Sequence, residues 1–459
     1  MPRDQQDLPL AGSPASAAAF DRAVADYFAL GGDPVGGLKR ALVDDPSFAL
    51  GAVAIAGLFM IGGFRGDHVE VTGALGAAEA AIARASPRER RHLAAAKALA
   101  AGRSGEAIRL WEDILVDYPT DALALRFSQD AYFLLGESLA IRDSVARVLP
   151  AWDRDNPLTS FILGLYAFGL EEAGDLGRAE QFGREALARN PADAWAVHAL
   201  AHVMETANRQ EEGIAFLKGS RPSWGGAHFM AGHNGWHLAL YLIEEGRFAE
   251  VLADYDRFTA PKLADDATLD RIDAASLLWR LELAGVDVGE RWAPVARQWM
   301  RHVDDHVLAF NDLHLALAAA RSPDPSDVAR LRASLDDYGR FGEGDNRQVT
   351  AEVGRSLIEG ALRFAARDYA GAVAAILPVR YRAFRIGGSH AQRDIVNQTL
   401  IAAAERAGQW NLARALLAER VALRPTGHTK RAYERALRTA GQARAPFSTE
   451  GGEGVVAKQ

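Results

Sequence analysis

The sequence predicts an all-α protein built as a helical-repeat solenoid. Residues that favour turns recur at nearly constant steps along the chain. Between these turns, apolar residues recur with the three- and four-residue spacing of amphipathic helices. No segment shows the sustained alternation of apolar and polar residues that a half-buried β-strand needs.

The turn residues give the repeat its length. These residues are Gly102, Gly136, Gly174, Asn208 and Gly246. The steps between them are close to the length of one tetratricopeptide-like repeat. Glycine and asparagine accept the left-handed conformation that ends many helices, so we expect a helix to end before each of them. In three places an alanine precedes a proline by the same spacing, at Ala107, Ala179 and Ala413. This spacing resembles the tetratricopeptide repeat, a helix-turn-helix unit of about 34 residues that stacks into a solenoid.

The segments on either side of these repeats are also expected to be helical. Ser86-Pro87-Arg88-Glu89 has the residues of a helix-starting capping box, with proline at the first helical position. Residues 48–64 carry no charge, but four glycines lower their hydrophobicity and favour a buried core helix over a membrane span. The expected regions are an N-terminal helical region at 1–88, regular repeats at 89–259, a less regular helical region at 260–345, C-terminal repeats at 346–440 and a disordered tail at 441–459.

Composition excludes several classes of function. The chain has 459 residues, of which 49% are hydrophobic and 24% charged, as in ordinary soluble proteins. Its net charge of -8 argues against a nucleic-acid partner. It contains no cysteine, which excludes disulfides, thiolate nucleophiles and cysteine-based zinc sites. The N-terminal segment lacks the apolar core of a secretory signal, so we expect a cytoplasmic protein without a membrane partner.

Four histidines are spaced as two matching pairs. His198 and His202 have i, i+4 spacing and so lie on one face of a helix. His233 and His237 have the same spacing and follow the first pair by about one repeat. Equivalent helices of neighbouring repeats lie side by side, roughly 8–10 Å apart between their axes. The sequence therefore predicts a two-by-two patch of imidazoles.

Such a patch suits two kinds of chemistry. Neutral imidazoles bind divalent transition metals such as zinc, with His198, His202, His233 and His237 as ligands. Glu205 continues the same helix face and would complete a metal shell with His202. Without a metal, imidazoles act as general acid and base near neutral pH. The alternative is that these histidines are polar residues of a solvated groove, or core residues bonded to backbone carbonyls.

Two later segments carry related side chains. Asn311, Asp312 and His314 lie close together in the sequence, and Asp312 is expected to orient a histidine from another helix. Gly387-Gly388-Ser389 precedes Gln392, Arg393 and Asp394, which predicts a capped helix start that favours anions.

At these residues the chain resembles a known family, tetratricopeptide repeat protein 38. The resemblance rests on five motifs that appear in the family's order between about residues 20 and 430: His198-x-x-x-His202-Val-x-Glu205, His233-Asn-x-Trp-His237-x-Ala-Leu-Tyr-Leu-Ile-Glu, Ser276-Leu-Leu-Trp-Arg-Leu, Phe310-Asn-Asp-x-His314 and Ser389-x-Ala-Gln-Arg-Asp394. It implies a tetratricopeptide-like helical fold, and it does not by itself imply a reaction.

The leading functional hypothesis is an enzyme that acts on a small polar molecule by hydrolysis or elimination. The expected catalytic residues are His202, His237, Asp312 and His314, and the expected substrate contacts are Asn234, Asn311, Gln392, Arg393 and Asp394. Arg393 would bind a substrate carboxylate. The alternatives are a scaffold that holds a protein partner in its groove and a protein that only binds a metal or metabolite. Glycines beside the histidines favour a small cavity over a groove: Gly225, Gly226, Gly232 and Gly235.

Overall fold

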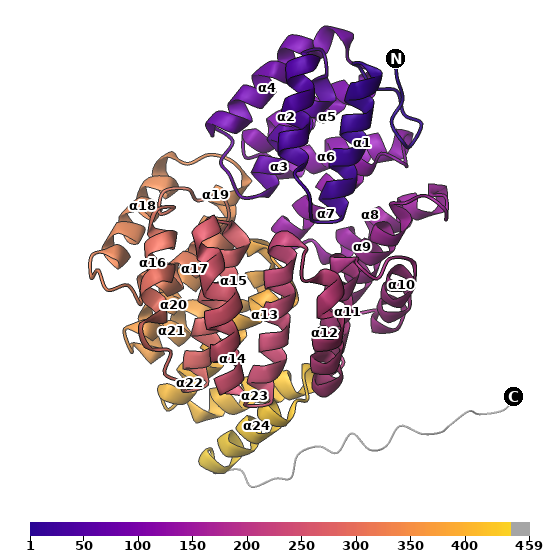
Figure 1. Ribbon diagram of the computed structural model, residues 1–459. Coiled ribbons are helices and arrows are strands. Elements are labelled where there is room, and N and C mark those ends of the chain that lie inside the picture. The colour runs from indigo at the N-terminus through magenta and orange to yellow at the C-terminus, as the bar shows by residue number, and fades with distance from the viewer. Residues whose placement is uncertain (442–459) are drawn as a thin grey trace, which may run out of the picture.

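The computed structural model describes residues 1–441, which form 24 α-helices joined by short turns (Figure 1). The all-α prediction is confirmed, and one isolated bridge between Arg3 and Pro9 is the only β feature of these residues. Apart from Gly441, the expected disordered tail lies outside the described residues. The helices are α1 (Pro14–Phe28), α2 (Pro34–Asp44), α3 (Ala49–Ile61), α4 (Val69–Ala81), α5 (Pro87–Ala100), α6 (Ser104–Asp117), α7 (Ala122–Leu135), α8 (Ser138–Val148), α9 (Thr159–Glu172), α10 (Leu176–Arg189), α11 (Ala194–Thr206), α12 (Gln210–Trp224), α13 (His228–Glu244), α14 (Phe248–Asp254), α15 (Thr268–Leu283), α16 (Trp292–Met300), α17 (Ala309–Ala319), α18 (Asp327–Phe341), α19 (Asp345–Val349), α20 (Arg355–Ala365), α21 (Tyr369–Ile376), α22 (His390–Arg406), α23 (Trp410–Leu423) and α24 (Gly427–Thr439).

Tight left-handed turns join the helices in pairs, as expected for a helical repeat. All five turn residues singled out from the sequence have positive φ, between 59° and 86°. At the turn after α9, the amide of Gly174 donates to the carbonyl of Glu171 at 2.8 Å, and the amide of Asp175 donates to that of Leu170 at 2.8 Å. These two bonds satisfy carbonyls that the end of the helix would otherwise leave unpaired. Gly285, Arg367 and Gly408 continue the series of positive-φ turns into the C-terminal half.

The first helices of consecutive pairs pack directly on one another. Helix α9 packs against α11, α11 against α13, and α13 against α15. The less regular region at 260–345 forms α15 to α18, and α17 in turn packs against α20. One face of each first helix is therefore turned toward the neighbouring repeat, which sets the histidine-bearing faces of α11 and α13 against each other (Figure 1).

The C-terminal helices return to the middle of the array. Helix α22 packs against α15 as well as against α20 and α21. The indole of Trp279 donates to Thr399 at 2.9 Å, and the buried guanidinium of Arg280 donates to the backbone carbonyls of Ala391 and Gln392 at 3.0 and 3.2 Å. The start of α22 is thereby fixed beside the first helices of the central repeats.

Within residues 48–64, Ala49–Ile61 form helix α3, whose packing against α4 and α5 buries most of its apolar residues, as the sequence predicts. Among residues 1–441, no helix combines the length and the apolar character that a membrane crossing requires. The predicted capping box is also present, with Ser86 and Glu89 each bonding to the other's backbone amide at the start of α5.

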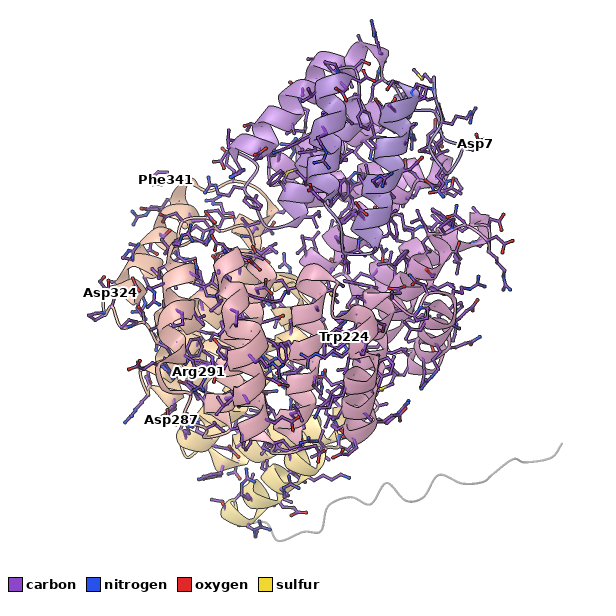
Figure 2. The ribbon with its side chains drawn as sticks, in the orientation of Figure 1. Asp7, Trp224, Asp287, Arg291, Asp324 and Phe341 are labelled. Atoms are coloured by element: carbon purple, nitrogen blue, oxygen red, sulfur yellow. The ribbon has the colours of Figure 1, made fainter. Side chains whose placement is uncertain are left out.

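The glycines beside α13 do not pack as expected. Trp224, labelled in Figure 2, is buried at the end of α12, just before the turn into α13. A Cβ at Gly226 or Gly235 would have no neighbouring heavy atom within 4 Å, whereas one at Gly232 would meet Asp270 at 3.1 Å. Of these three glycines, only Gly232 therefore lies close to another side chain. The turn after α12, which contains Gly226, runs over the surface.

A buried ionic network fixes the N-terminus. The guanidinium of Arg88 lies 2.9 Å from a carboxylate oxygen of Asp121 and 3.3 Å from one of Asp4, with all three side chains 1–2% exposed. His92 lies 3.0 Å from Asp121 through Nε2. Burial raises the pKa of Asp4 to about 6, although the charge of Arg88 opposes this shift. The network ties the first residues of the chain to α5 and to the start of α7.

We expect Arg88→Ala to lower the free energy of unfolding by about 3–5 kcal/mol, because the change leaves two buried carboxylates without their cation. Chemical unfolding followed by circular dichroism measures this loss. The matched control is Arg91→Ala on the same helix, which removes an exposed pair with Asp117 and should cost less than about 1 kcal/mol. Equal losses in the two variants would contradict a buried network.

Candidate functional site: a buried histidine cluster

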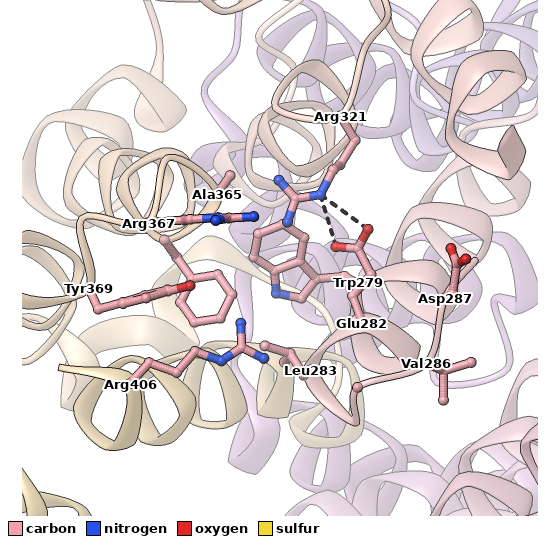
Figure 3. Close-up of a pocket in the computed structure, with 12 residues that line it drawn as sticks. Trp279, Glu282, Leu283, Val286, Asp287, Arg321, Ala365, Arg367, Tyr369 and Arg406 are labelled. Carbon is pink, nitrogen blue, oxygen red and sulfur yellow. Dashed lines mark hydrogen bonds and ion pairs between the residues drawn. The ribbon is translucent and has the colours of Figure 1, made fainter. Parts of the chain in front are cut away.

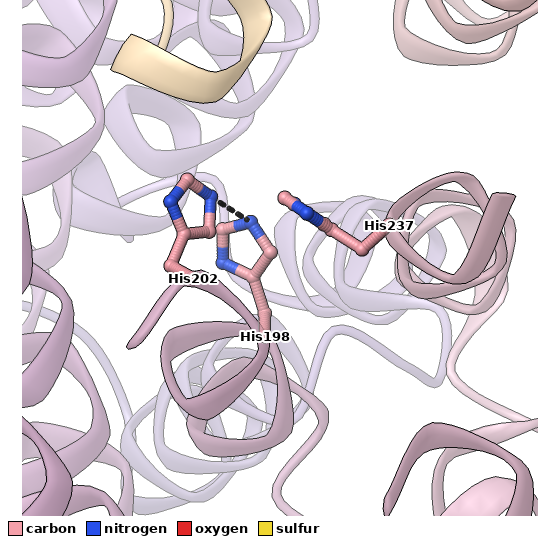
Figure 4. Close-up of side chains that lie close together, drawn as sticks. All are labelled: His198, His202 and His237. Atoms are coloured by element: carbon pink, nitrogen blue, oxygen red, sulfur yellow. Dashed lines mark hydrogen bonds between the residues drawn. The ribbon is translucent and has the colours of Figure 1, made fainter. Parts of the chain in front are cut away.

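The four paired histidines form one cluster. Their ring centroids lie 4.5–5.1 Å apart, and each residue is 0–3% exposed. Figure 4 shows His198 and His202 rising from α11 toward His237, which projects from α13. The predicted two-by-two patch is therefore present, but it is enclosed in the protein rather than exposed on a groove.

Buried polar contacts hold the two helices in register. Helix α11 begins at Asp193, whose side chain accepts hydrogen bonds from the amides of Trp195 and Ala196 at 3.0 and 2.9 Å. Asn234 donates from α13 to the carbonyl of Ala194 at 3.2 Å. Asn234 was expected to contact substrate, but here its amide group fastens α13 to the start of α11.

A carboxylate lies behind three of the four imidazoles. Each carboxylate comes from a different first helix, α9, α11 or α15. Because a neutral imidazole that donates its Nδ1 proton to a carboxylate keeps a lone pair on Nε2, this arrangement is typical of metal-ligating histidines. The carboxylate-to-Nδ1 distances are 3.3 Å for Glu171 and His202, 3.4 Å for Glu205 and His237, and 3.0 Å for Asp273 and His233.

The opposite ring nitrogens converge. The Nε2 atoms of His198 and His202 lie 3.1 Å apart, and Nε2 of His237 is buried without a hydrogen-bond partner. One potential ligand atom from each of these three residues lies within 4.8 Å of the others. A second group with the same property consists of Glu171, Glu172, His202 and His390, so His202 belongs to both.

The interior keeps His198 and His237 neutral. Burial, together with the nearby imidazoles of His202 and His237, lowers the pKa of His198 well below its ordinary value. Burial and the neighbouring imidazoles also lower the pKa of His237 to about 3, although Glu205 opposes this shift. At neutral pH both rings therefore carry a free lone pair, which is the form that binds a metal ion.

One side of the cluster is lined by cations from the C-terminal segment. Nε2 of His390 lies 2.8 Å from Glu171, and Arg424 lies 3.0 Å from Nδ1 of His390 and donates to Glu205 at 2.5 Å. Burial disfavours the charge on His390, but Glu171 and Glu172 outweigh it and raise the pKa to about 9. The His390 side chain is 28% exposed, so the approach from solvent passes its ring.

The segment at 311–314 does not join the cluster. Asp312 lies 3.2 Å from Nδ1 of His306, which belongs to the loop before α17, and it orients that ring instead of a cluster histidine. His314 is buried and bonds through Nδ1 to the carbonyl of Phe310 at 2.8 Å, one helical turn earlier. Asn311 is half-buried in the first turn of α17. Asp312 and His314 bond to His306 and Phe310 instead of to the cluster because these two partners are closer along the chain than any cluster residue.

The start of α22 approaches the cluster in a different way from that expected. Gln392 is used by the capping box with Ser389. Arg393 donates to the carbonyl of Gly388 and lies 3.6 Å from Glu172, so it neutralises a protein carboxylate instead of facing a substrate site. Asp394 receives two hydrogen bonds from Arg420, at 2.6 and 2.9 Å. Glu205, expected beside His202, approaches His237.

Sequence reasoning missed Glu171, Asp273, His390 and Arg424 as partners of the cluster. The repeat length offered a signal for the first of these, because Glu171 precedes Glu205 by one repeat and so occupies the equivalent place on α9. Asp273 follows His233 by somewhat more than one repeat, which weakens the same signal. Nothing local marks His390 or Arg424, because they meet the cluster only when the C-terminal helices fold back.

No model of a known protein family matches the chain. The function is therefore argued from the site itself, whose chemistry rests on its residues and not on its fold. The site offers neutral buried imidazoles, carboxylates that orient them and a cationic side that is partly open to solvent.

We expect Asp193→Asn to change how stability depends on pH. Burial raises the pKa of Asp193 to about 7, and one of its oxygens is buried without a hydrogen-bond partner. Because the folded pKa lies above the ordinary value of 3.8, the wild type should lose stability as the pH rises through about 7. Asparagine keeps the cap acceptor without the charge, so the variant should lack this loss.

Urea unfolding of both proteins at about pH 5 and about pH 8 measures the difference. Asp193→Ala, which removes the cap, should lower the free energy of unfolding by about 0.5–2 kcal/mol. An identical pH dependence of wild type and Asp193→Asn would contradict a protonated Asp193 in the folded state.

Proposed function

We propose that this protein is an enzyme that acts on a small polar molecule and that holds a divalent transition metal, such as zinc, with His198, His202 and His237. The observation that carries the proposal is the convergence of three buried imidazoles, of which His202 and His237 are backed by carboxylates. Catalytic zinc sites commonly use three protein ligands and leave a fourth position for water or substrate.

The neutral state of the rings favours metal-assisted chemistry over imidazole acid–base catalysis. A useful general base has a pKa near the working pH, whereas the pKa of His237 is lowered to about 3. A metal ion in the same place acidifies a bound water and polarises a carbonyl, which supports hydrolysis or elimination.

The cavity beside the cluster is small. It has a volume of about 30 Å³, room for little more than water, and Glu205, Arg280 and Arg424 are among its lining residues. Arg280 already binds the carbonyls of Ala391 and Gln392, and Arg424 binds the carboxylate of Glu205, so a small polar substrate would enter only if these contacts opened.

A non-catalytic metal-binding protein is the second candidate, because the cluster residues are at most 3% exposed and the neighbouring cavity is small. A peptide-binding scaffold has less support. The first helices α9 and α11 are contacted on the cluster side by His390 and Arg424 of the C-terminal segment, which occupies the place of a peptide.

We also propose that the chain is a tetratricopeptide-like protein of the protein 38 type with a cytoplasmic location. The paired helices, the left-handed turns and the position of four of the five motifs around or near the cluster support the first part. The lack of cysteine in a protein with a buried ionic core agrees with a reducing compartment.

We expect about one metal ion per chain in protein purified without a polyhistidine tag, measured by elemental mass spectrometry. The double variant His198→Ala/His237→Ala should lose the ion while its helical content, measured by circular dichroism, stays nearly unchanged. His428→Ala is the control, because His428 is exposed and lies outside the cluster. Metal retained in the double variant would contradict the proposed ligands.

Removing a carboxylate behind a ligand should weaken metal binding without abolishing it. We expect Glu171→Gln to raise the dissociation constant for Zn²⁺ by about 10- to 100-fold, because the His202 ring loses the group that orients it. Competition with a chromophoric chelator measures the constant. Glu212→Gln, an exposed change on α12, should leave it unchanged.

A further inference from the structure

A second cavity lies on the other side of the C-terminal half. It has a volume of about 590 Å³, within the range of small-molecule sites, and it opens where α15, α17, α20 and α22 end (Figure 3). None of its lining residues belongs to the histidine cluster. We call it the arginine cleft, after Arg321, Arg367 and Arg406, whose guanidinium groups line it.

Aromatic rings form one wall of the arginine cleft. The rings of Trp279 and Phe364 have centroids 5.4 Å apart, and Phe364 and Tyr369 are also 5.4 Å apart in an edge-to-face arrangement. Arg406 lies over Phe364 at 4.8 Å, and Arg321 lies over Trp279 at 5.1 Å. Trp279 and Phe364 are 0% and 3% exposed, and the indole of Trp279 donates a hydrogen bond to Thr399. The half-buried ring of Tyr369 is therefore the part of the wall that a ligand can reach.

Three arginines line this cleft together with two acidic residues, Glu282 and Asp287. Arg321 is paired with Glu282, at 2.9 Å. Arg367 and Arg406 make neither an ion pair nor a side-chain hydrogen bond with the described part of the chain. Figure 3 shows these guanidinium groups directed toward the space beside the aromatic wall.

The helix dipoles favour a cation at the positions of all three arginines, because each lies at or just after a helix C-terminus. Arg321 also bonds to the carbonyl of Ala320 at 3.4 Å, whereas Arg367 and Arg406 are exposed. The guanidinium groups of Arg367 and Arg406 form no such bond to a carbonyl among residues 1–441. Their donors are left available to a ligand.

The backbone at Arg367 departs from the pattern of the fold. Its amide donates to Phe364 and that of Asp368 donates to Arg363, the same bonds that Gly174 and the following residue make after α9. Arg367 therefore takes the left-handed position, with φ of 64°. Most equivalent turns use glycine or asparagine there: Gly102, Gly136, Gly174, Asn208, Gly246, Gly285 and Gly408. Leu30 takes the same position after α1, with φ of 54°, so this turn also tolerates residues with a long side chain.

We propose that the arginine cleft binds a small organic anion, with a phosphate or carboxylate group held by Arg367 and Arg406 and an apolar body placed beside Tyr369, at the accessible edge of the aromatic wall. Guanidinium groups recognise both kinds of anionic group through paired hydrogen bonds. The site is separate from the histidine cluster and needs no metal.

The test measures binding of three probes, phenyl phosphate, adenosine monophosphate and benzoate, by isothermal titration calorimetry. We expect at least one probe to bind the wild type and Arg367→Gly to raise its dissociation constant by about tenfold or more, since a charge-assisted hydrogen bond is lost. Glycine suits the left-handed turn, so the melting temperature of the unliganded variant should equal or exceed that of the wild type.

Two controls distinguish recognition of the anionic group from non-specific binding. Arg363→Ala removes an arginine of α20, just before the turn that holds Arg367, whose pairs with Glu359 and Asp368 lie outside the cleft lining, and it should leave the dissociation constant unchanged. Adenosine, which lacks the phosphate, should bind at least about tenfold more weakly than adenosine monophosphate if the latter binds. The proposal is overturned if no probe binds, if Arg367→Gly binds as tightly as the wild type, or if Arg363→Ala weakens binding equally.

Discussion

The central part of this structure depends on the neutralisation of buried carboxylates by side chains from the C-terminal segment. Four carboxylates near the cluster are paired with cations: Glu171 with His390, Glu172 with Arg393, Glu205 with Arg424 and Asp394 with Arg420. Leaving any of these carboxylates unpaired in the interior would cost several kcal/mol, about 3–5 for a broken buried pair. The first three pairs can form only if α22 and the residue after α23 lie against α9 and α11, so charge balance fixes how the two halves of the chain meet.

The same charge balance shapes the chemistry of the histidine cluster. Glu171 and Glu205 are held ionised by their cations, since His390 and Arg424 offset the effect of burial and keep both pKa values below the ordinary range. These carboxylates lie 3.3 and 3.4 Å from Nδ1 of His202 and His237, although neither contact has hydrogen-bond geometry. A nearby anion favours a proton on Nδ1 and a lone pair on Nε2, so the salt bridges of the fold also favour the tautomer that a metal ligand needs.

Periodic features of the sequence predicted more than isolated motifs did. The left-handed turns at Gly174 and Asn208 follow from a repeat length, and the histidine patch follows from a repeat length combined with i, i+4 spacing. Both are properties of neighbouring repeats. The motif at 311–314 was misjudged because Asp312 has a closer partner, His306, whose approach depends on the path of the loop before α17.

The sequence by itself determined the helical class, the turns that pair the helices and the meeting of His198 and His202 with His233 and His237, because these depend on contacts within a repeat or between adjacent repeats. The tertiary structure decided the burial of that cluster, the arrival of His390 and Arg424, and the arginine cleft at the ends of four helices. These features join residues that lie several repeats apart in the chain, such as Glu171 and His390. Their contacts arise from the superhelical path of the whole array, which sums small rotations between repeats that no local pattern encodes.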